Sequence, residues 1–175
     1  MSGGPGVQDG IFVAATEEDY SIFARLVRDY AAWLHARLAD EAWFIDAVLR
    51  HQSLDDELNA LPKTYGPPQG RVLLAHHNGE IAGGAAYHKL SDSICEMKRM
   101  FVFDRFRGKG LGRRLCDAIV ASARQDGYRL MQLDTSRKLT EAITMYKSIG
   151  FQECPPYREY PEELIPHLLF MERAL

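Results

Sequence analysis

The chain of 175 residues holds only three cysteines, Cys95, Cys116 and Cys154. They are odd in number, widely spaced, and form no Cys-x-x-Cys pair. The sequence therefore predicts neither a disulfide framework nor a structural zinc site. We expect a protein without a bound metal that works in a reducing compartment, the cytoplasm.

Long apolar runs are also missing. No run approaches the ~20 residues that a membrane-spanning helix needs, so we expect no membrane association. The opening Met-Ser-Gly-Gly-Pro-Gly has neither a basic nor an apolar stretch, so no signal peptide is predicted. Residues 1–10 are rich in glycine, and we expect a flexible leader followed by a single domain over residues 11–175.

Charge is nearly balanced overall but unevenly distributed. The net charge of −3 argues against a general nucleic-acid-binding protein. Residues 96–114 nevertheless carry seven basic and two acidic side chains. A basic segment in an otherwise acidic chain indicates one localised anion site.

The spacing of apolar residues predicts a mixed α/β fold, with helices packed on a sheet. Thr16 and Asp19 resemble a capping box at the start of a helix, and Ser53 resembles a second N-cap on a short helix that Pro62 ends. Asn78-Gly79 predicts a two-residue hairpin. Helices are also expected around residues 43–48, 111–127 and 138–149, and strands at 11–15, 71–75, 81–90, 94–103, 128–133, from 151, and at 167–173.

The most informative motif is the turn Arg107-Gly108-Lys109-Gly110-Leu111-Gly112, which lies between a predicted strand and a predicted helix. Glycines let the backbone take positive φ and approach a ligand closely. The unpaired N–H groups at the start of the following helix, together with the helix dipole, favour an anion. The sequence therefore predicts a site for a phosphate or pyrophosphate.

Two common phosphate motifs do not match this turn. The Walker A loop, GxxxxGK[ST], is absent. The dinucleotide-binding pattern GxGxxG needs a glycine where this chain has Arg113, and three predicted strands precede the one that leads into the turn. A nucleotide-dependent oxidoreductase is therefore a distant alternative.

Three segments together resemble the GCN5-related N-acetyltransferase (GNAT) superfamily. They are Glu96-Met97-Lys98-Arg99-Met100-Phe101-Val102, Arg107-x-x-Gly110-x-Gly112, and Ala142-Ile143-x-Met145-Tyr146-x-x-x-Gly150-Phe151. The resemblance implies an acyl-CoA N-acyltransferase-like α/β (α+β) fold, with a mixed, largely antiparallel sheet flanked by helices. It also implies acetyl-CoA as the donor and an amine as the acceptor.

The same resemblance implies which residues bind the coenzyme. The backbone of Met100, Phe101 and Val102 would pair with the pantetheine arm, and one of these amides would hold the thioester carbonyl. The backbone amides of the glycine turn would hold the pyrophosphate. The residues of the turn concerned are Arg107, Gly108, Lys109, Gly110, Leu111, Gly112 and Arg113.

Acetyl transfer to an amine needs a proton acceptor and benefits from a proton donor to the leaving thiolate. Tyr146 is the predicted general acid, by the resemblance; its periodicity alone would make it a half-buried core aromatic. Glu96 is the predicted general base, directly or through water, although an exposed strand residue paired with Lys98 explains it equally well. The histidines that flank the hairpin, His88 among them, are expected on the surface.

The acceptor is less well determined. The segments that would frame it, residues 20–61 and 154–166, are acidic, which suits a cationic amine of a small molecule or peptide but also an ordinary acidic surface. A catalytically silent acyl-CoA-binding sensor of the same fold is the alternative function, and Tyr146 favours the enzyme. A homodimer stays open: the apolar run Leu168–Met171 fits an interface or a core strand.

Overall fold

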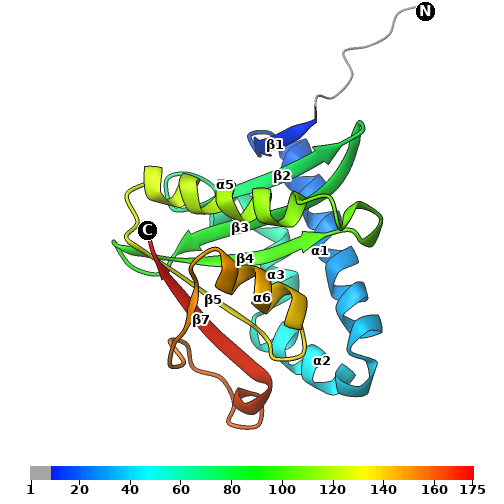
Figure 1. Ribbon diagram of the computed structural model, residues 1–175, viewed down its shortest axis with the longest axis vertical. Helices are drawn as coiled ribbons and strands as arrows, with labels where there is room; N and C mark the ends of the chain where they lie inside the picture. Colours follow the sequence, from blue (N-terminus) through cyan, green and yellow to red (C-terminus); the bar gives the residue numbers. More distant parts are fainter. Residues whose placement is uncertain (1–8) are drawn as a thin grey trace, which may run out of the picture.

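A computed structural model describes residues 9–175, which form one sheet with helices on both faces (Figure 1). The strands lie in the order β1-β2-β3-β4-β5-β7-β6. β4 and β5 run parallel and every other neighbouring pair is antiparallel, which confirms the expected fold class. The strands are β1 (Gly10–Val13), β2 (Arg71–His77), β3 (Glu80–Lys89), β4 (Ile94–Val102), β5 (Leu130–Ser136), β6 (Gln152–Glu153) and β7 (Leu168–Ala174).

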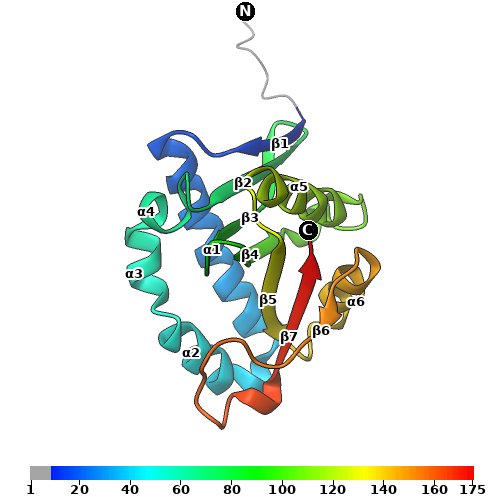
Figure 2. The same cartoon turned by 90° about the vertical axis from the view of Figure 1, so that its left-hand side faces the viewer.

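The helices are divided between the two faces of the sheet (Figure 2). One face carries α1 (Glu17–Arg37), α2 (Ala42–His51), α3 (Leu54–Asn59) and α4 (Leu61–Tyr65). The other carries α5 (Leu111–Gln125) and α6 (Thr140–Ser148). Because the sheet is covered on both sides, β4 in its middle contacts α1 on one face and α5 on the other.

The capping box predicted for α1 is confirmed. Thr16 Oγ1 accepts a hydrogen bond from the Asp19 amide at 3.2 Å, and the Asp19 carboxylate accepts one from the Thr16 amide at 2.9 Å. These two bonds satisfy donors that a helix start leaves unpaired. The helix expected around residues 111–127 is also confirmed as α5, and its Leu115 and Ile119 are fully buried.

The prediction for residues 53–62 is wrong in two respects. Ser53 precedes α3 in the left-handed conformation, with φ 52°, and its side chain caps nothing. Pro62 does not end a helix but lies in the first turn of α4. Proline is tolerated there because the first N–H groups of a helix have no partner within it.

The hairpin predicted at Asn78-Gly79 is confirmed, and the neighbouring pairing of β3 with β4 is irregular. Asn78 and Gly79 have φ values of 53° and 77° between β2 and β3. The register between β3 and β4 shifts between Gly84 and Ala86, and Arg99 takes the left-handed φ of 57° on the opposite strand. A Cβ at Gly83 would lie 2.4 Å from the Phe101 carbonyl oxygen, so a glycine is needed where β4 approaches so closely.

The ends of the chain differ in part from expectation. Residues 1–8 of the predicted leader lie outside the described residues, whereas Gly10 already belongs to β1. The apolar run of β7 is a core strand: Leu168, Leu169, Phe170 and Met171 are all buried between neighbouring strands and helices. None of the helices within residues 9–175 has the length and apolar character that crossing a membrane requires.

Candidate active site

The glycine turn connects a short 3-10 turn, Asp104–Phe106, to the start of α5. Gly108 and Gly110 have φ values of 75° and 74°, and a Cβ built on either would meet nothing within 4 Å. Their conformation, rather than crowding, therefore requires glycine. No side chain of the described residues caps α5 at Gly110, so its first N–H groups are left for a ligand.

The side chain of Arg107 fastens the turn to the sheet. Its guanidinium lies 4.4 Å from the centre of the Trp33 ring, and its Nε donates to the Val102 carbonyl oxygen at 3.0 Å. Asp104 pairs with the same guanidinium at 2.9 Å. The Arg107 side chain thus orders the end of β4. The Arg107 amide, one of the predicted diphosphate donors, is used within the protein, since it donates to the Asp104 carbonyl oxygen at 3.1 Å.

β4 and β5 separate along their length. They pair at only three positions, the last joining Glu96 to Gln132, although both strands continue beyond it. The left-handed Arg99 and the register shift bend β4 at the point where the strands part. Backbone groups of β4 beyond this point have no partner on β5, so the sheet opens as a wedge.

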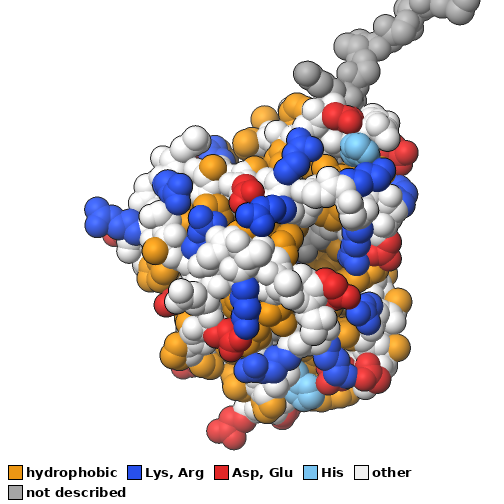
Figure 3. Space-filling model, in the orientation of Figure 1, with side chains coloured by type: hydrophobic (Ala, Val, Ile, Leu, Met, Phe, Trp, Pro, Cys, Tyr) orange, Lys and Arg blue, Asp and Glu red, His pale blue; other side chains and the backbone are white. Residues whose placement is uncertain are grey.

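A cavity of about 560 Å³ fills this wedge; we call it the wedge cavity. Nine of the ten residues predicted to bind the coenzyme line it, and Lys109 is the exception. Figure 3 shows Lys and Arg side chains over the face that carries α5 and α6, several of them beside a hollow between these helices. The lining residues among those predicted are Met100, Phe101, Val102, Arg107, Gly108, Gly110, Leu111, Gly112 and Arg113.

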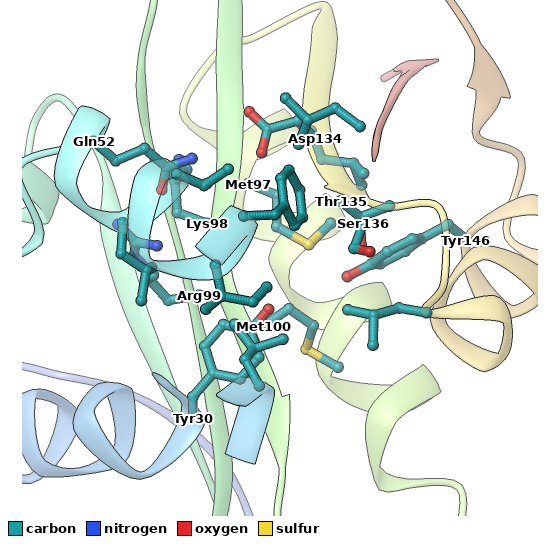
Figure 4. A pocket seen from close by; sticks show the side chains of 18 residues that line it. Tyr30, Gln52, Met97, Lys98, Arg99, Met100, Asp134, Thr135, Ser136 and Tyr146 are labelled. Carbon is teal, nitrogen blue, oxygen red and sulfur yellow. The ribbon is translucent and has the colours of Figure 1, made fainter. Parts of the chain in front are cut away.

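Tyr146 on α6 lies between the wedge cavity and a second, narrow cavity of about 80 Å³, and it lines both. Figure 4 shows its hydroxyl directed toward the centre of the narrow cavity. Within residues 9–175 this hydroxyl has no hydrogen-bond partner, whereas the ring packs edge-on against Phe151. Burial raises the pKa of Tyr146 well above its usual value, so the phenol keeps its proton at neutral pH.

Glu96 lies on β4, fully buried. His88 Nε2 lies 2.7 Å from one carboxylate oxygen, the Tyr157 hydroxyl donates to the other at 2.9 Å, and Arg158 forms an ion pair with the group. Burial alone would raise the pKa of Glu96, but nearby Lys98, together with His88 and Arg158, lowers it to about 2. The carboxylate is therefore ionised, and both of its oxygens already have partners within the protein.

None of the three partners of Glu96 is predicted as such from the sequence, although Tyr157 and Arg158 lie in the segment 154–166 that is expected to frame the acceptor. His88 was expected on the surface but is partly buried against Glu96, with its ring edge-on to Tyr65. Tyr157 and Arg158 come from the loop between β6 and β7. The only sequence signal was the position of this loop before the last strand, since irregular segments carry no periodicity.

Lys98 is two residues beyond Glu96 on the same strand. Its side chain lines the narrow cavity and also a wide cavity of about 430 Å³ on the face of α3 and α4. The predicted pairing of Glu96 with Lys98 is replaced by the contacts of Glu96 with His88, Tyr157 and Arg158.

Many carboxylates of the acidic segments are used within the protein. Glu57 is bonded by two nitrogens of Arg99 at 2.9 and 2.8 Å, and Asp46 pairs with His35 at 2.7 Å. Asp40 pairs with Lys138 at 2.5 Å. The acidity of residues 20–61 therefore serves, in good part, to hold the helices to the rest of the chain.

Nucleophilic and metal chemistry find little support among the described residues. Cys95 and Cys116 are buried, and burial raises the pKa of each thiol to about 12, so neither thiol is ionised near neutral pH. All three cysteines are free. Residues 9–175 contain no group of three or more His, Cys, Asp or Glu side chains arranged to hold a metal ion.

Comparison with known proteins identifies the family. Residues 20–151 match the model of the Acetyltransferase (GNAT) family. An uncharacterised N-acetyltransferase of Schizosaccharomyces pombe is 38% identical over 125 residues, covering 70% of this chain and 75% of the relative. The uncharacterised N-acetyltransferase YjgM of Escherichia coli is 28% identical over 148 residues, covering 83% of each chain.

A solved structure supports the fold. The PaiA N-acetyltransferase of Thermoplasma acidophilum, in complex with coenzyme A, superposes with a TM-score of 0.70 at 17% identity, covering 95% of this chain and 99% of that one. The open β4–β5 wedge, the glycine turn and these matches agree with one another. The chain belongs to the acetyltransferase (GNAT) family of enzymes, which use acetyl-CoA as the acetyl donor.

Proposed function

We propose that the protein moves an acetyl group from acetyl-CoA to a primary amine of a small molecule or peptide, by direct attack within a ternary complex. The observation that carries the proposal is the wedge cavity, which extends from the glycine turn to Tyr146. A coenzyme bound along it would have its diphosphate at the turn and its thioester beside the phenol. Direct attack is favoured over a covalent enzyme intermediate because the buried cysteine thiols are protonated.

In this proposal the backbone does most of the coenzyme binding. The N–H groups of residues 108–113 and the start of α5 hold the diphosphate, since unpaired amides and the helix dipole both favour an anion. The backbone of Met100, Phe101 and Val102 pairs with the pantetheine arm where β5 has moved away. One of these amides stabilises the negative charge that develops on the thioester oxygen.

Tyr146 acts as the general acid. The amine nitrogen attacks the thioester carbonyl carbon, so that a C–N bond forms and the C–S bond breaks. The leaving sulfur takes the phenolic proton of Tyr146, and the attacking nitrogen releases one proton, from which the phenol is restored through solvent. The raised pKa of the phenol supports this role, because the proton is present when the thiolate leaves.

The role of Glu96 as general base stays a prediction, and its contacts weigh against a direct role. A carboxylate with a pKa of about 2 that already binds His88, Tyr157 and Arg158 is a weak proton acceptor. In the alternative that the contacts favour, Glu96 positions these three side chains beside the acceptor. A Glu96→Gln enzyme whose pH–rate profile keeps its wild-type acidic limb would support the positioning role.

The test combines binding and turnover. Acetyl-CoA should raise the thermal unfolding temperature, whereas NAD and ATP at equal concentration should raise it less, because a ligand of the native state stabilises it. Release of free CoA with a panel of primary amines should then exceed release without amine. Stabilisation by acetyl-CoA with no turnover across the panel would instead support the silent acyl-CoA-binding sensor.

A further inference from the structure

Lys98 is a buried cation without a partner. Only 8% of the residue is exposed, and its ammonium makes no hydrogen bond or ion pair within the described part of the chain. It lines both the narrow and the wide cavity, and Figure 4 shows it at the wall of the narrow one. An ammonium largely shielded from water and without a partner is costly, so an anion bound in these cavities would stabilise it.

The carboxylates near Lys98 are already bonded elsewhere. Glu57 is held by two nitrogens of Arg99, and Asp134 accepts from the Tyr160 hydroxyl at 2.9 Å. Glu96 has the three donors described above. Lys98 therefore feels these negative charges at a distance, while its own hydrogen-bonding capacity is unused. Burial lowers the pKa of its ammonium, and Asp134 and Glu96 only partly offset this.

The positions of the two cavities indicate how a bound acceptor would be oriented. The narrow cavity extends from Lys98 to Tyr146 and Met100, where the thioester is proposed to lie. The wide cavity joins Lys98 to Arg158, His88 and Lys63 on the face of α3 and α4, and Asp56 and Glu57 also line it. A molecule with an amine near an anionic group could place the amine toward Tyr146, the anion at Lys98 and its remaining atoms in the wide cavity.

We propose that the acceptor amine carries a carboxylate, and that this carboxylate forms an ion pair with Lys98. Arg158, which shares the wide cavity, contributes a second positive charge. α-Amino acids are the simplest members of this substrate class. The inference rests on the proposed acetyl transfer and narrows it: purely cationic amines, which the acidity of residues 20–61 would suit, become the poorer substrates.

The test compares amino acids with the amines that differ from them only by loss of the carboxylate, such as phenylalanine with 2-phenylethylamine and leucine with 3-methylbutylamine. With wild-type enzyme we expect kcat/KM to be at least about tenfold higher for the better amino acid than for its decarboxylated partner. Lys98→Met should remove most of this preference and leave the KM for acetyl-CoA within about threefold. Lys98→Arg, which keeps the charge, should retain it.

Two further measurements control the test. Lys63→Met removes an exposed cation at the rim of the wide cavity and should leave the preference within about threefold of wild type. If Lys98→Met does not fold, inhibition of wild-type turnover replaces it: 3-phenylpropanoate should compete with the acceptor at least about tenfold better than 3-phenylpropanamide.

Three results would overturn the inference. Wild-type enzyme could prefer the decarboxylated amines, Lys98→Met could lower both members of each pair equally, or acetyl-CoA alone could acetylate Lys98, detected by peptide mass spectrometry. Transfer to amines that lack a carboxylate, without any to amino acids, removes this inference and leaves the proposed function intact. Absence of turnover with every amine removes both.

Discussion

The wedge cavity and the two cavities around Lys98 all adjoin β4, but the wedge cavity is built from different groups than the other two. The wedge is formed by backbone: glycines at positive φ, the start of α5 and a strand that has lost its neighbour. The wide cavity beside Lys98 is lined mostly by charged and polar side chains, among them Glu57, Lys63 and Arg158, and the narrow cavity adds Arg99 and Asp134 to a largely apolar lining. Backbone groups suit the binding of a coenzyme that is the same in every reaction. A network of side chains suits a site that must select one acceptor among many.

The largest expected effect concerns the side-chain network. Glu96→Gln leaves His88, Lys98 and Arg158 without their buried counter-charge. We expect the free energy of unfolding to fall by about 3 kcal/mol at pH 7, measured by urea denaturation. Asp92→Asn, which breaks a pair whose carboxylate is 98% exposed, is the matched control and should cost under about 1 kcal/mol. Equal losses in the two variants would contradict the account of the network.

The pH dependence of stability sharpens this test. Because the pKa of Glu96 is lowered to about 2 in the folded protein, its contribution is fully present above its unfolded value near 4.5. Wild-type protein should therefore lose about 3 kcal/mol through this group as the pH falls from about 5 to about 2. Glu96→Gln should show a flatter curve over the same range, and an unchanged slope would count against the buried charge.

The next largest effect is on catalysis. Tyr146→Phe removes a hydroxyl that bonds to nothing among the described residues, so folding should be unaffected. We expect kcat to fall about 100-fold, with the KM for acetyl-CoA within about threefold, measured by CoA release. Tyr20→Phe, at the far end of α1, is the control and should keep wild-type turnover. Wild-type kcat in Tyr146→Phe would remove the general-acid role.

The contribution of backbone is tested by a pair of glycines. Gly110 and Gly79 have similar φ values, 74° and 77°, and a Cβ at either meets nothing within 4 Å. Alanine should destabilise the protein by about 1 kcal/mol at both positions. Only Gly110→Ala should weaken acetyl-CoA binding, by about tenfold, because it changes the direction in which the N–H groups of the turn point. Calorimetric titration measures this difference, and equal Kd values for the two variants would contradict the role of the turn in coenzyme binding.

The smallest effect is expected for the predicted coenzyme residue outside the wedge cavity. Lys109 is exposed, with its Nζ 3.4 Å from His77 Nε2. Lys109→Ala should weaken acetyl-CoA binding by no more than about threefold, and the difference should disappear at high salt, because an exposed charge is screened. A tenfold loss that persists in salt would show that side chains, too, bind the diphosphate.

The two regions also differ in how far the sequence predicts them. The glycine turn, its flanking strand and α5 form one continuous stretch, so the local rules of glycine, helix starts and apolar spacing apply directly. The Glu96 network joins residues about sixty positions apart, and Gln52 bonds to Tyr160 across 108. No local rule links such residues, which is why Tyr157 and Arg158 are not predicted as partners of Glu96. His88 is only eight residues from Glu96 and lies opposite it across the β3–β4 pair, but a single histidine on a hairpin strand gives the same local signal whether it is exposed or bonded.

Ser53 shows the same limit on a smaller scale. A serine three residues before an acid satisfies the local rule for a capping box, yet Ser53 is left-handed and caps nothing. Thr16 satisfies the same rule and does cap α1. The difference arises from how α2 and α3 join, since α2 ends at His51 directly before the turn. The four residues of the motif do not determine this tertiary arrangement.

A crystal structure with coenzyme A tests the central claim most directly. The account predicts diphosphate oxygens within about 3 Å of the backbone nitrogens of residues 108–113, and the coenzyme sulfur beside the Tyr146 hydroxyl in the wedge between β4 and β5. Coenzyme A bound elsewhere with this turn empty, or a sulfur remote from Tyr146, would contradict it.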